Sequence, residues 1–201
     1  LTLLAFIPAA LALNLTPGAD MMFCLGLGLR AGPRPAIAAS AGISAGGMVH
    51  VTLAGLGLAA AIAAFPLALD VIRWLGVGYL LWLAWGALRQ GPVRAQARAM
   101  GAARAFREGM VVNLLNPKVI LFVLAFVPQF VDPAHAILLQ FLVYGLVLAL
   151  GGLIINGAVG VFAGGLGRRL ATSPRLARGV GLVSAGIFTA LAARLALMQR
   201  S

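Results

Sequence analysis

The chain has 201 residues, of which 62% are hydrophobic and 9% are charged, and its net charge at neutral pH is +11. A soluble domain carries roughly 25% charged residues, whereas here apolar stretches close to the ~18-residue length of a spanning helix recur along the whole sequence. The composition therefore excludes a soluble domain of any size and predicts a single integral membrane domain.

Six apolar runs follow one another along the chain, and two of them contain an internal break. The first run is interrupted at residues 14–20 and the fourth at residues 116–118. The start of the first run has no basic region before it, so we read it as part of a span and not as a signal peptide. The expected fold class is an all-α integral membrane protein with six transmembrane helices. The runs cover residues 1–29, 36–64, 67–88, 109–131, 136–166 and 179–198.

Arginines are concentrated in alternate loops between these runs. The second and fourth loops have only Arg73 at a flank, whereas the first, third and fifth hold eleven arginines. The positive-inside rule places those three loops in the cytoplasm and both termini outside. This charge therefore sets orientation and does not indicate nucleic-acid binding. The arginines are Arg30, Arg34, Arg89, Arg94, Arg98, Arg104, Arg107, Arg168, Arg169, Arg175 and Arg178.

Similar residues open the two breaks, half the chain apart. Asn14-Leu15-Thr16-Pro17 opens the first, and Asn113-Leu114-Leu115-Asn116-Pro117 opens the second. Each half then contains three spans, and because three is odd the second half must insert upside down relative to the first. This predicts two inverted repeats within one transport domain. The first repeat covers residues 1–88, a cytoplasmic loop residues 89–108, and the second repeat residues 109–201.

The breaks are candidate binding sites. We expect Thr16 and Asn116 to cap half-helices that begin at Pro17 and Pro117. In an inverted repeat the positive ends of both half-helices face one central region, which suits an anion or a carboxylate. The alternative is a pair of proline kinks with only a packing role. The residues expected to bind substrate are Asn14, Thr16, Pro17, Gly18, Asp20, Asn113, Asn116, Pro117 and Lys118.

Two charges lie deep in apolar runs. Lys118 follows Pro117 at a helix start, where a cation opposes the helix dipole, and Asp20 is its natural partner. The pair could hold the breaks closed or be exchanged for the charged groups of a substrate. A purely structural ion pair, or a Lys118 side chain that reaches a membrane interface, is the alternative.

The second span of each half carries one polar residue within a row of small residues. His50 and Asn156 should therefore point into the bundle. His50 is a candidate for proton coupling beside Asp20, because its reference pKa is near neutral. A hydrogen bond between helices is the alternative role for either residue. The small residues are Gly42, Gly46 and Ala54 in one row and Gly152, Gly160 and Gly164 in the other.

The third run and the segment after it carry two features typical of membrane interfaces. The segment 89–108 is rich in arginine, which sets orientation or contacts anionic lipid head groups. A group of aromatic side chains fits an interfacial belt. These are Trp74, Tyr79, Trp82 and Trp85.

Several of these motifs together resemble the LysE/RhtB family of bacterial translocators, which export amino acids such as lysine, homoserine and threonine. The resemblance covers nearly the whole chain. It rests on residues 14–20, the glycine-rich stretch 30–57, residues 76–85, and Phe106-Arg107-Glu108-Gly109 leading into 113–118. It implies export across the inner membrane driven by an ion gradient, as proton antiport.

The leading hypothesis is an exporter of amino acids or similar metabolites, and not an enzyme. Its expected partners are the substrate, a coupling proton and the lipid bilayer, with no nucleic acid, cofactor or metal; assembly into a homo-oligomer stays open. A metal-ion exporter would want more ligands than Asp20, Cys24 and His50. A membrane enzyme lacks a nucleophile–base pair, and one cysteine excludes a dithiol carrier. A passive channel is a further alternative.

Overall fold

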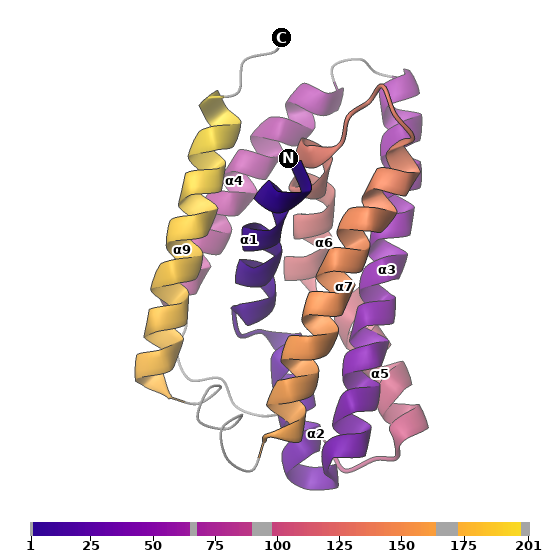
Figure 1. Cartoon of the computed structure of the whole chain (residues 1–201), viewed down its shortest axis with the longest axis vertical. Coiled ribbons are helices and arrows are strands. Elements are labelled where there is room, and N and C mark those ends of the chain that lie inside the picture. The colour runs from indigo at the N-terminus through magenta and orange to yellow at the C-terminus, as the bar shows by residue number, and fades with distance from the viewer. Residues whose placement is uncertain (1, 65–67, 90–97, 164–172, 198–201) are drawn as a thin grey trace.

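The computed structural model describes residues 2–64, 68–89, 98–163 and 173–197, and within these ranges the chain is helical without strands. The helices lie side by side along one long axis (Figure 1). They are α1 Thr2–Leu15, α2 Ala19–Ala31, α3 Pro33–Ala64, α4 Ala68–Arg89, α5 Ala102–Leu114, α6 Pro117–Ala125, the 3-10 helix η1 Val127–Phe130, α7 Ile137–Val161 and α9 Pro174–Leu197.

Several of these helices are long and apolar enough to cross a membrane. Pro33–Leu58 of α3 and the whole of α7 qualify alone, and up to four spans result if each bent pair of helices is one span. The exterior is correspondingly apolar, as Leu53, Ile154 and Val183 show by being more than 60% exposed. The chain is therefore a helical membrane protein, and the six-span arrangement stays a prediction for α4 and α9.

Both expected breaks are present. The axes of α1 and α2 meet at 51°, and the pair made by α5 with the helices after Pro117 is bent by 56°. At the second break Asn116 caps α6 as predicted, because its side chain accepts a hydrogen bond from the backbone N–H of Lys118, and Pro117 is the first helical residue.

The predicted cap of the first break is wrong. Helix α2 begins at Ala19 with Gly18 as its N-cap residue, two residues after the expected start at Pro17. The hydroxyl of Thr16 instead donates to the carbonyl of Ala12 at 2.5 Å. A threonine hydroxyl can bond back to the preceding turn, so Thr16 closes the end of α1 and does not cap α2.

Two expected loops are shorter than the sequence suggested. The basic loop at residues 30–35 is reduced to Gly32, because α2 reaches Ala31 and α3 begins at Pro33. Gly32 has φ 86°, a left-handed conformation that glycine adopts without steric cost. Helix α5 already starts at Ala102, inside the segment 89–108. Three arginines of the charge argument lie outside the described ranges, namely Arg94, Arg168 and Arg169.

A turn at Asp132-Pro133 joins η1 to α7. The backbone N–H of Ala134 donates to one carboxylate oxygen of Asp132 and the ring of His135 contacts the other, both at 2.9 Å. Both contacts lower the pKa of the exposed Asp132 carboxyl below its ordinary value, and the hydrogen bond from Ala134 has the larger effect. The turn thereby reverses the chain so that α7 packs back along α3.

Glycines allow the helices to approach closely. A Cβ on Gly42 of α3 would lie 1.9 Å from the backbone oxygen of Phe106 on α5, and one on Gly109 of α5 would lie 2.4 Å from that of Ala39. A Cβ on Gly28 of α2 would lie 2.0 Å from the backbone oxygen of Gly160 on α7. The small-residue rows are therefore packing faces, as expected; Gly164 lies outside the described residues.

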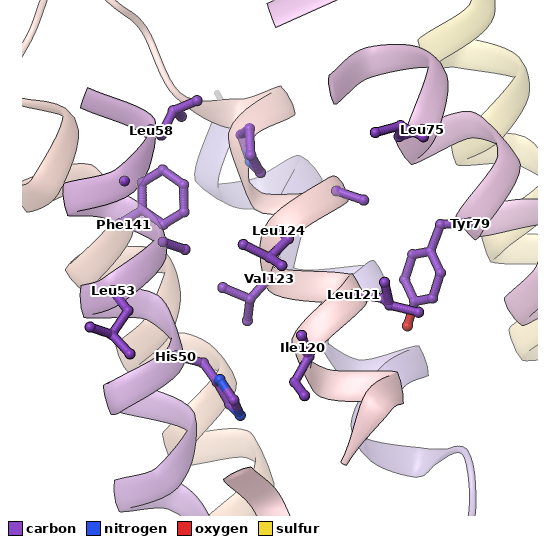
Figure 2. A pocket seen from close by; sticks show the side chains of 14 residues that line it. His50, Leu53, Leu58, Leu75, Tyr79, Ile120, Leu121, Val123, Leu124 and Phe141 are labelled. Atoms are coloured by element: carbon purple, nitrogen blue, oxygen red, sulfur yellow. The ribbon is translucent and has the colours of Figure 1, made fainter. Parts of the chain in front are cut away.

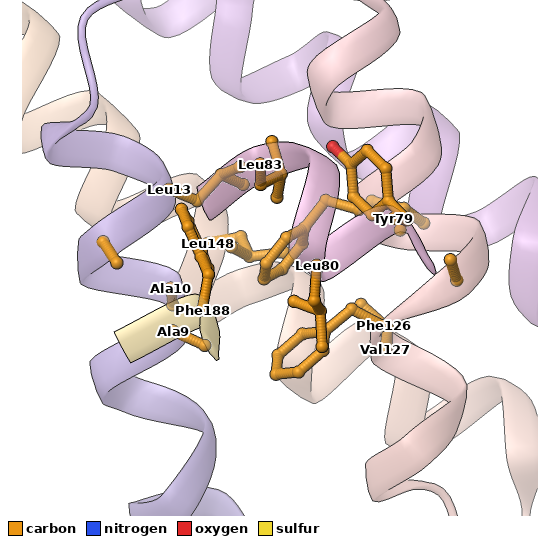
Figure 3. Close-up of a cluster of buried hydrophobic side chains, with 14 of the residues drawn as sticks. Ala9, Ala10, Leu13, Tyr79, Leu80, Leu83, Phe126, Val127, Leu148 and Phe188 are labelled. Atoms are coloured by element: carbon orange, nitrogen blue, oxygen red, sulfur yellow. The ribbon is translucent and has the colours of Figure 1, made fainter. Parts of the chain in front are cut away.

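The largest apolar core joins α1, α3, α4, α6, α7 and α9, and Figure 3 shows part of it. Phe6 of α1 stacks on Phe126 with ring centroids 6.0 Å apart. The ring of Tyr144 on α7 also lies against Phe6, with centroids 4.8 Å apart. Phe188 of α9 is also fully buried. This core packs Phe6 of α1 against Phe122 of α6, with ring centroids 6.3 Å apart.

Candidate functional site

The start of α6 meets the end of α1. The ammonium Nζ of Lys118 donates to the backbone carbonyls of Leu13 at 3.0 Å and Thr16 at 2.8 Å. The last carbonyls of a helix have no partner within it and form its negative end. Lys118 therefore satisfies carbonyls that the first break leaves free. Gly18 provides the room, since a Cβ there would lie only 3.3 Å from Nζ.

The start of α2 meets the end of α5 in the same manner. Asp20 lies in the first turn of α2, where a carboxylate is favoured by the helix dipole. Its Oδ2 accepts a hydrogen bond of 2.9 Å from the side-chain amide of Asn113, one residue before the end of α5. The two breaks are thus joined crosswise, each through a residue that opens its second half-helix.

The direct ion pair expected between Asp20 and Lys118 is absent. Within the described part of the chain the salt bridges are Arg104–Glu108 and His135–Asp132. Each of these half-buried charges has instead taken its polar partner from the helix end that the opposite break exposes. Asp20 and Lys118 nevertheless line one small cavity together.

Two small cavities of about 40 and 20 Å³ lie between the breaks, and we call them the central chamber. They share part of their lining, namely Leu13, Asn14, Asp20, Val119 and Asn156. A cavity needs about 10–15 Å³ of such space to hold a water molecule, so both cavities have room for water but not for an amino acid. The central chamber is too small for a substrate in this structure.

The central chamber collects most of the residues expected to bind substrate. Besides the shared residues, Asn113 lines the larger cavity, and Thr16, Gly18 and Lys118 line the smaller. Pro17, Asn116 and Pro117 line neither cavity and instead shape the breaks. His50 lies apart, on the wall of a larger apolar cavity.

Three buried polar atoms lack a hydrogen-bond partner among the residues that the structure describes, and all three belong to the breaks. They are Asp20 Oδ1, Asn113 Oδ1 and Asn116 Nδ2. Asn113 and Asn116 are only 3% and 5% exposed. Buried polar atoms are nearly always hydrogen-bonded. The breaks therefore offer two acceptors and one donor to a polar occupant.

Comparison with known proteins identifies the family. The sequence model of the LysE type translocators matches residues 11–199. The chain belongs to the LysE type translocator family. It is 33% identical over 144 residues to the homoserine/homoserine lactone efflux protein of Salmonella typhimurium, covering 70% of each chain. It is 32% identical over 201 residues to the leucine efflux protein of Enterobacter sp. strain 638, covering 96% of this chain and 94% of the relative.

A third relative is an uncharacterized membrane protein of Vibrio cholerae, 35% identical over 146 residues and covering 71% of each chain. No solved structure matches the translocator. The family confirms the resemblance read from the sequence and makes the chain a translocator. Within the described part of the chain, no group of three or more His, Cys, Asp or Glu residues could hold a metal ion.

Two further side chains connect to the breaks of this translocator. His50 Nε2 donates to the backbone carbonyl of Asn113 at 3.2 Å, and the hydroxyl of Tyr79 donates to the carbonyl of Lys118. Tyr79 was grouped by sequence with three tryptophans, which are each more than half exposed, whereas Tyr79 is 7% exposed. Sequence reasoning therefore missed its link to the site.

Serines of α3 were also missed. Ser40 and Ser44 donate to backbone carbonyls of α7, at 3.0 Å to Leu153 and 2.9 Å to Ala149. Ser44 lines the central chamber. Both serines share a helix face with Gly47 and interrupt the apolar pattern of α3 at a spacing of four residues, and this spacing is the signal that could have identified them.

Proposed function

We propose that this translocator is a secondary transporter of the bacterial inner membrane that exports amino acids or related small metabolites by proton antiport. The relatives named for efflux of leucine and of homoserine support this substrate class. The observation that carries the location of the site is the set of partnerless polar atoms at the crossed breaks. Asp20 and Asn113, which carry two of these atoms, line the central chamber, so transport through it would give both atoms a polar partner.

The proposed architecture is six spans in two inverted repeats. Equivalent positions support it: Asn14 and Asn113 are each the next-to-last residue of a first half-helix, and Asp20 and Lys118 are each the second residue of a second half-helix. The start of α1 and the end of α9 lie at one end of the bundle, and the α2–α3 junction lies at the other (Figure 1). This supports a cytoplasmic side at the junction and outer termini.

The partnerless atoms suit a zwitterion. Asp20 Oδ1 and Asn113 Oδ1 can accept hydrogen bonds from a substrate ammonium, and Asn116 Nδ2 can donate to its carboxylate. Lys118 joins the carboxylate by exchanging its bonds to the α1 carbonyls. Because the chamber holds only water-sized volumes, the breaks have to separate for a substrate to enter.

Asp20 is the first candidate for the proton-coupling group, because it is the carboxylate that lines the central chamber. His50 is the second, since its ring is one hydrogen bond away from Asn113. A carboxylate that exchanges a proton for a substrate ammonium would couple the two movements. A structural role for Asp20, limited to its bond with Asn113, is the competing hypothesis.

The test is Asp20→Asn in reconstituted proteoliposomes, with Asp132→Asn as the matched control at an exposed acid outside the breaks. The amide oxygen of the variant can still accept from Asn113, so the shape of the site is retained. We expect Asp20→Asn to exchange labelled substrate in counterflow but to lose its response to an imposed pH gradient. Asp132→Asn should keep both activities.

Normal gradient-driven uptake by Asp20→Asn would end the coupling hypothesis. If Asp132→Asn also lost its response to the pH gradient, the effect would not be specific to the site. If the wild-type protein passed substrate without counterflow, it would be a passive channel and not a carrier. If the wild-type protein moved no amino acid, the proposed function would be refuted.

A further inference from the structure

A second, much larger cavity lies beside the central chamber. Its volume is about 610 Å³, and Figure 2 shows α6 as its floor, with α3 on one side and α4 on the other. Its lining consists of His50, Leu53, Ala54, Gly57, Leu58, Leu75, Tyr79, Ile120, Leu121, Val123, Leu124, Ala125, Pro128 and Phe141. We call it the lateral cavity.

The lateral cavity offers an apolar surface. None of its lining residues is an acid, a lysine or an arginine. Its two polar side chains already have partners at the breaks, His50 on the carbonyl of Asn113 and Tyr79 on that of Lys118. A charged occupant would lose its hydration without gaining a partner, which is costly. An aliphatic occupant has only apolar area to bury.

The lateral cavity and the central chamber share a wall. Val123 of α6 lines both, and it is 1% exposed. The hydrogen bonds of His50 and Tyr79 run from the cavity wall to Asn113 and Lys118, the residues that face the breaks. A molecule with its charged groups at the breaks is therefore one side chain away from the apolar space.

We infer that the lateral cavity receives the side chain of the substrate while its ammonium and carboxylate lie at the breaks. This rests on the proposed function and adds a substrate class: neutral amino acids with aliphatic side chains, selected against basic and acidic ones. The cavity also opens between α3 and α4, where Leu53 and Leu75 are each 64% exposed. A lipid acyl chain is therefore the competing occupant.

Gly57 allows the cavity to be filled without disturbing the fold. It lies on the cavity wall, and a Cβ built on it meets nothing within 4 Å. Gly57→Leu would place a new side chain in the cavity. Gly86→Leu on α4 is the matched control, because its Cβ also meets nothing within 4 Å and it does not line the cavity. Leu124→Ala is a second variant that enlarges the cavity.

The experiment is counterflow of labelled leucine, alanine, phenylalanine and lysine in proteoliposomes of the full chain. Wild-type protein should exchange leucine and alanine, with lysine slower by about tenfold or more. Gly57→Leu should lower leucine exchange relative to alanine by about tenfold or more, the usual effect of a mis-sized apolar pocket. Gly86→Leu should match the wild type, and Leu124→Ala should raise phenylalanine exchange relative to leucine.

The outcomes separate this inference from the function on which it rests. Lysine exchange as fast as leucine exchange, or an equal loss of leucine and alanine exchange in Gly57→Leu, would overturn the side-chain site. Leucine exchange at the wild-type rate in both glycine variants would also overturn it. If the wild type exchanges no amino acid, the proposed function falls, and this inference falls with it.

Discussion

Replacing Lys118 with methionine tests the crosswise joint between the breaks. The variant keeps an unbranched side chain but loses two hydrogen bonds, of 3.0 Å to Leu13 and 2.8 Å to Thr16. Hydrogen bonds between helices in membranes contribute about 0.6 kcal/mol on average and at most about 1.7 kcal/mol. Two such bonds predict a loss of about 1–3 kcal/mol in the free energy of unfolding.

Unfolding in mixed micelles, titrated with a denaturing detergent, measures this free energy directly. Arg104→Met is the matched control, because Arg104 forms an exposed ion pair with Glu108 on the surface of α5. Such i,i+4 pairs contribute only about 0.3–0.5 kcal/mol. A Lys118→Met protein that unfolds with the wild-type free energy would show that the carbonyl bonds do not hold the breaks together. If Lys118→Met and Arg104→Met lost the same free energy of unfolding, the reasoning would also be refuted.

Two further predictions concern packing and orientation. Gly42→Ala should destabilise the protein by about 1–3 kcal/mol through overpacking, because its Cβ would lie 1.9 Å from the backbone oxygen of Phe106. In the same unfolding assay Gly86→Ala should be neutral or stabilising, because a Cβ there meets nothing within 4 Å. Equal stability of the two variants would contradict the packing argument. A reporter fused at Gly101 should give a cytoplasmic signal and one at the C-terminus an external signal, so a cytoplasmic signal from the C-terminal fusion would reverse the topology.

The breaks could be predicted from sequence because their causes are local. Proline lacks a backbone N–H and clashes with the preceding turn, which favours breaks at Pro17 and Pro117, although α1 accommodates Pro8 without a break. The cap at Asn116 was predictable for the same reason. The cap at Thr16 was not, because its hydroxyl had two acceptable partners, and the packed end of α1 beside Ser184 favours the bond back to Ala12.

The role of Tyr79 was hidden by its neighbours in sequence. Helical residues advance by about 100° each, which places Tyr79 about 140° from Trp74 and about 120° from Trp85 but only about 60° from Trp82. Its ring accordingly stacks on that of Trp82, with centroids 5.6 Å apart. Tyr79 thus lies at the edge of the tryptophan face, and treating the four aromatics as one interfacial group overlooked this position. The tryptophans form the exposed face of α4, and Tyr79 faces α6 and the carbonyl of Lys118.

The partners of Asp20 and Lys118 depend on geometry that the sequence does not contain. Sequence places both charges just inside the two breaks, and opposite charges there suggest an ion pair. In the structure the two charges do not pair. Lys118 bonds to carbonyls at the end of α1, and Asp20 bonds to the amide of Asn113 at the end of α5, which are polar groups that the breaks expose. Which helix end faces which charge follows only from the crossing of the two bent pairs.

This crossing explains how a small zwitterion could open a closed site. Lys118 holds the end of α1, and Asp20 holds the end of α5 through Asn113. In the proposed function a substrate carboxylate competes for Lys118 and a substrate ammonium competes for Asp20, so both ends of the molecule are required to release both joints. Since the backbone carbonyl of Asn113 also accepts a hydrogen bond from His50, a movement of this end of α5 would reach the wall of the lateral cavity. The charges at the breaks and the apolar space beside them would then respond to one binding event.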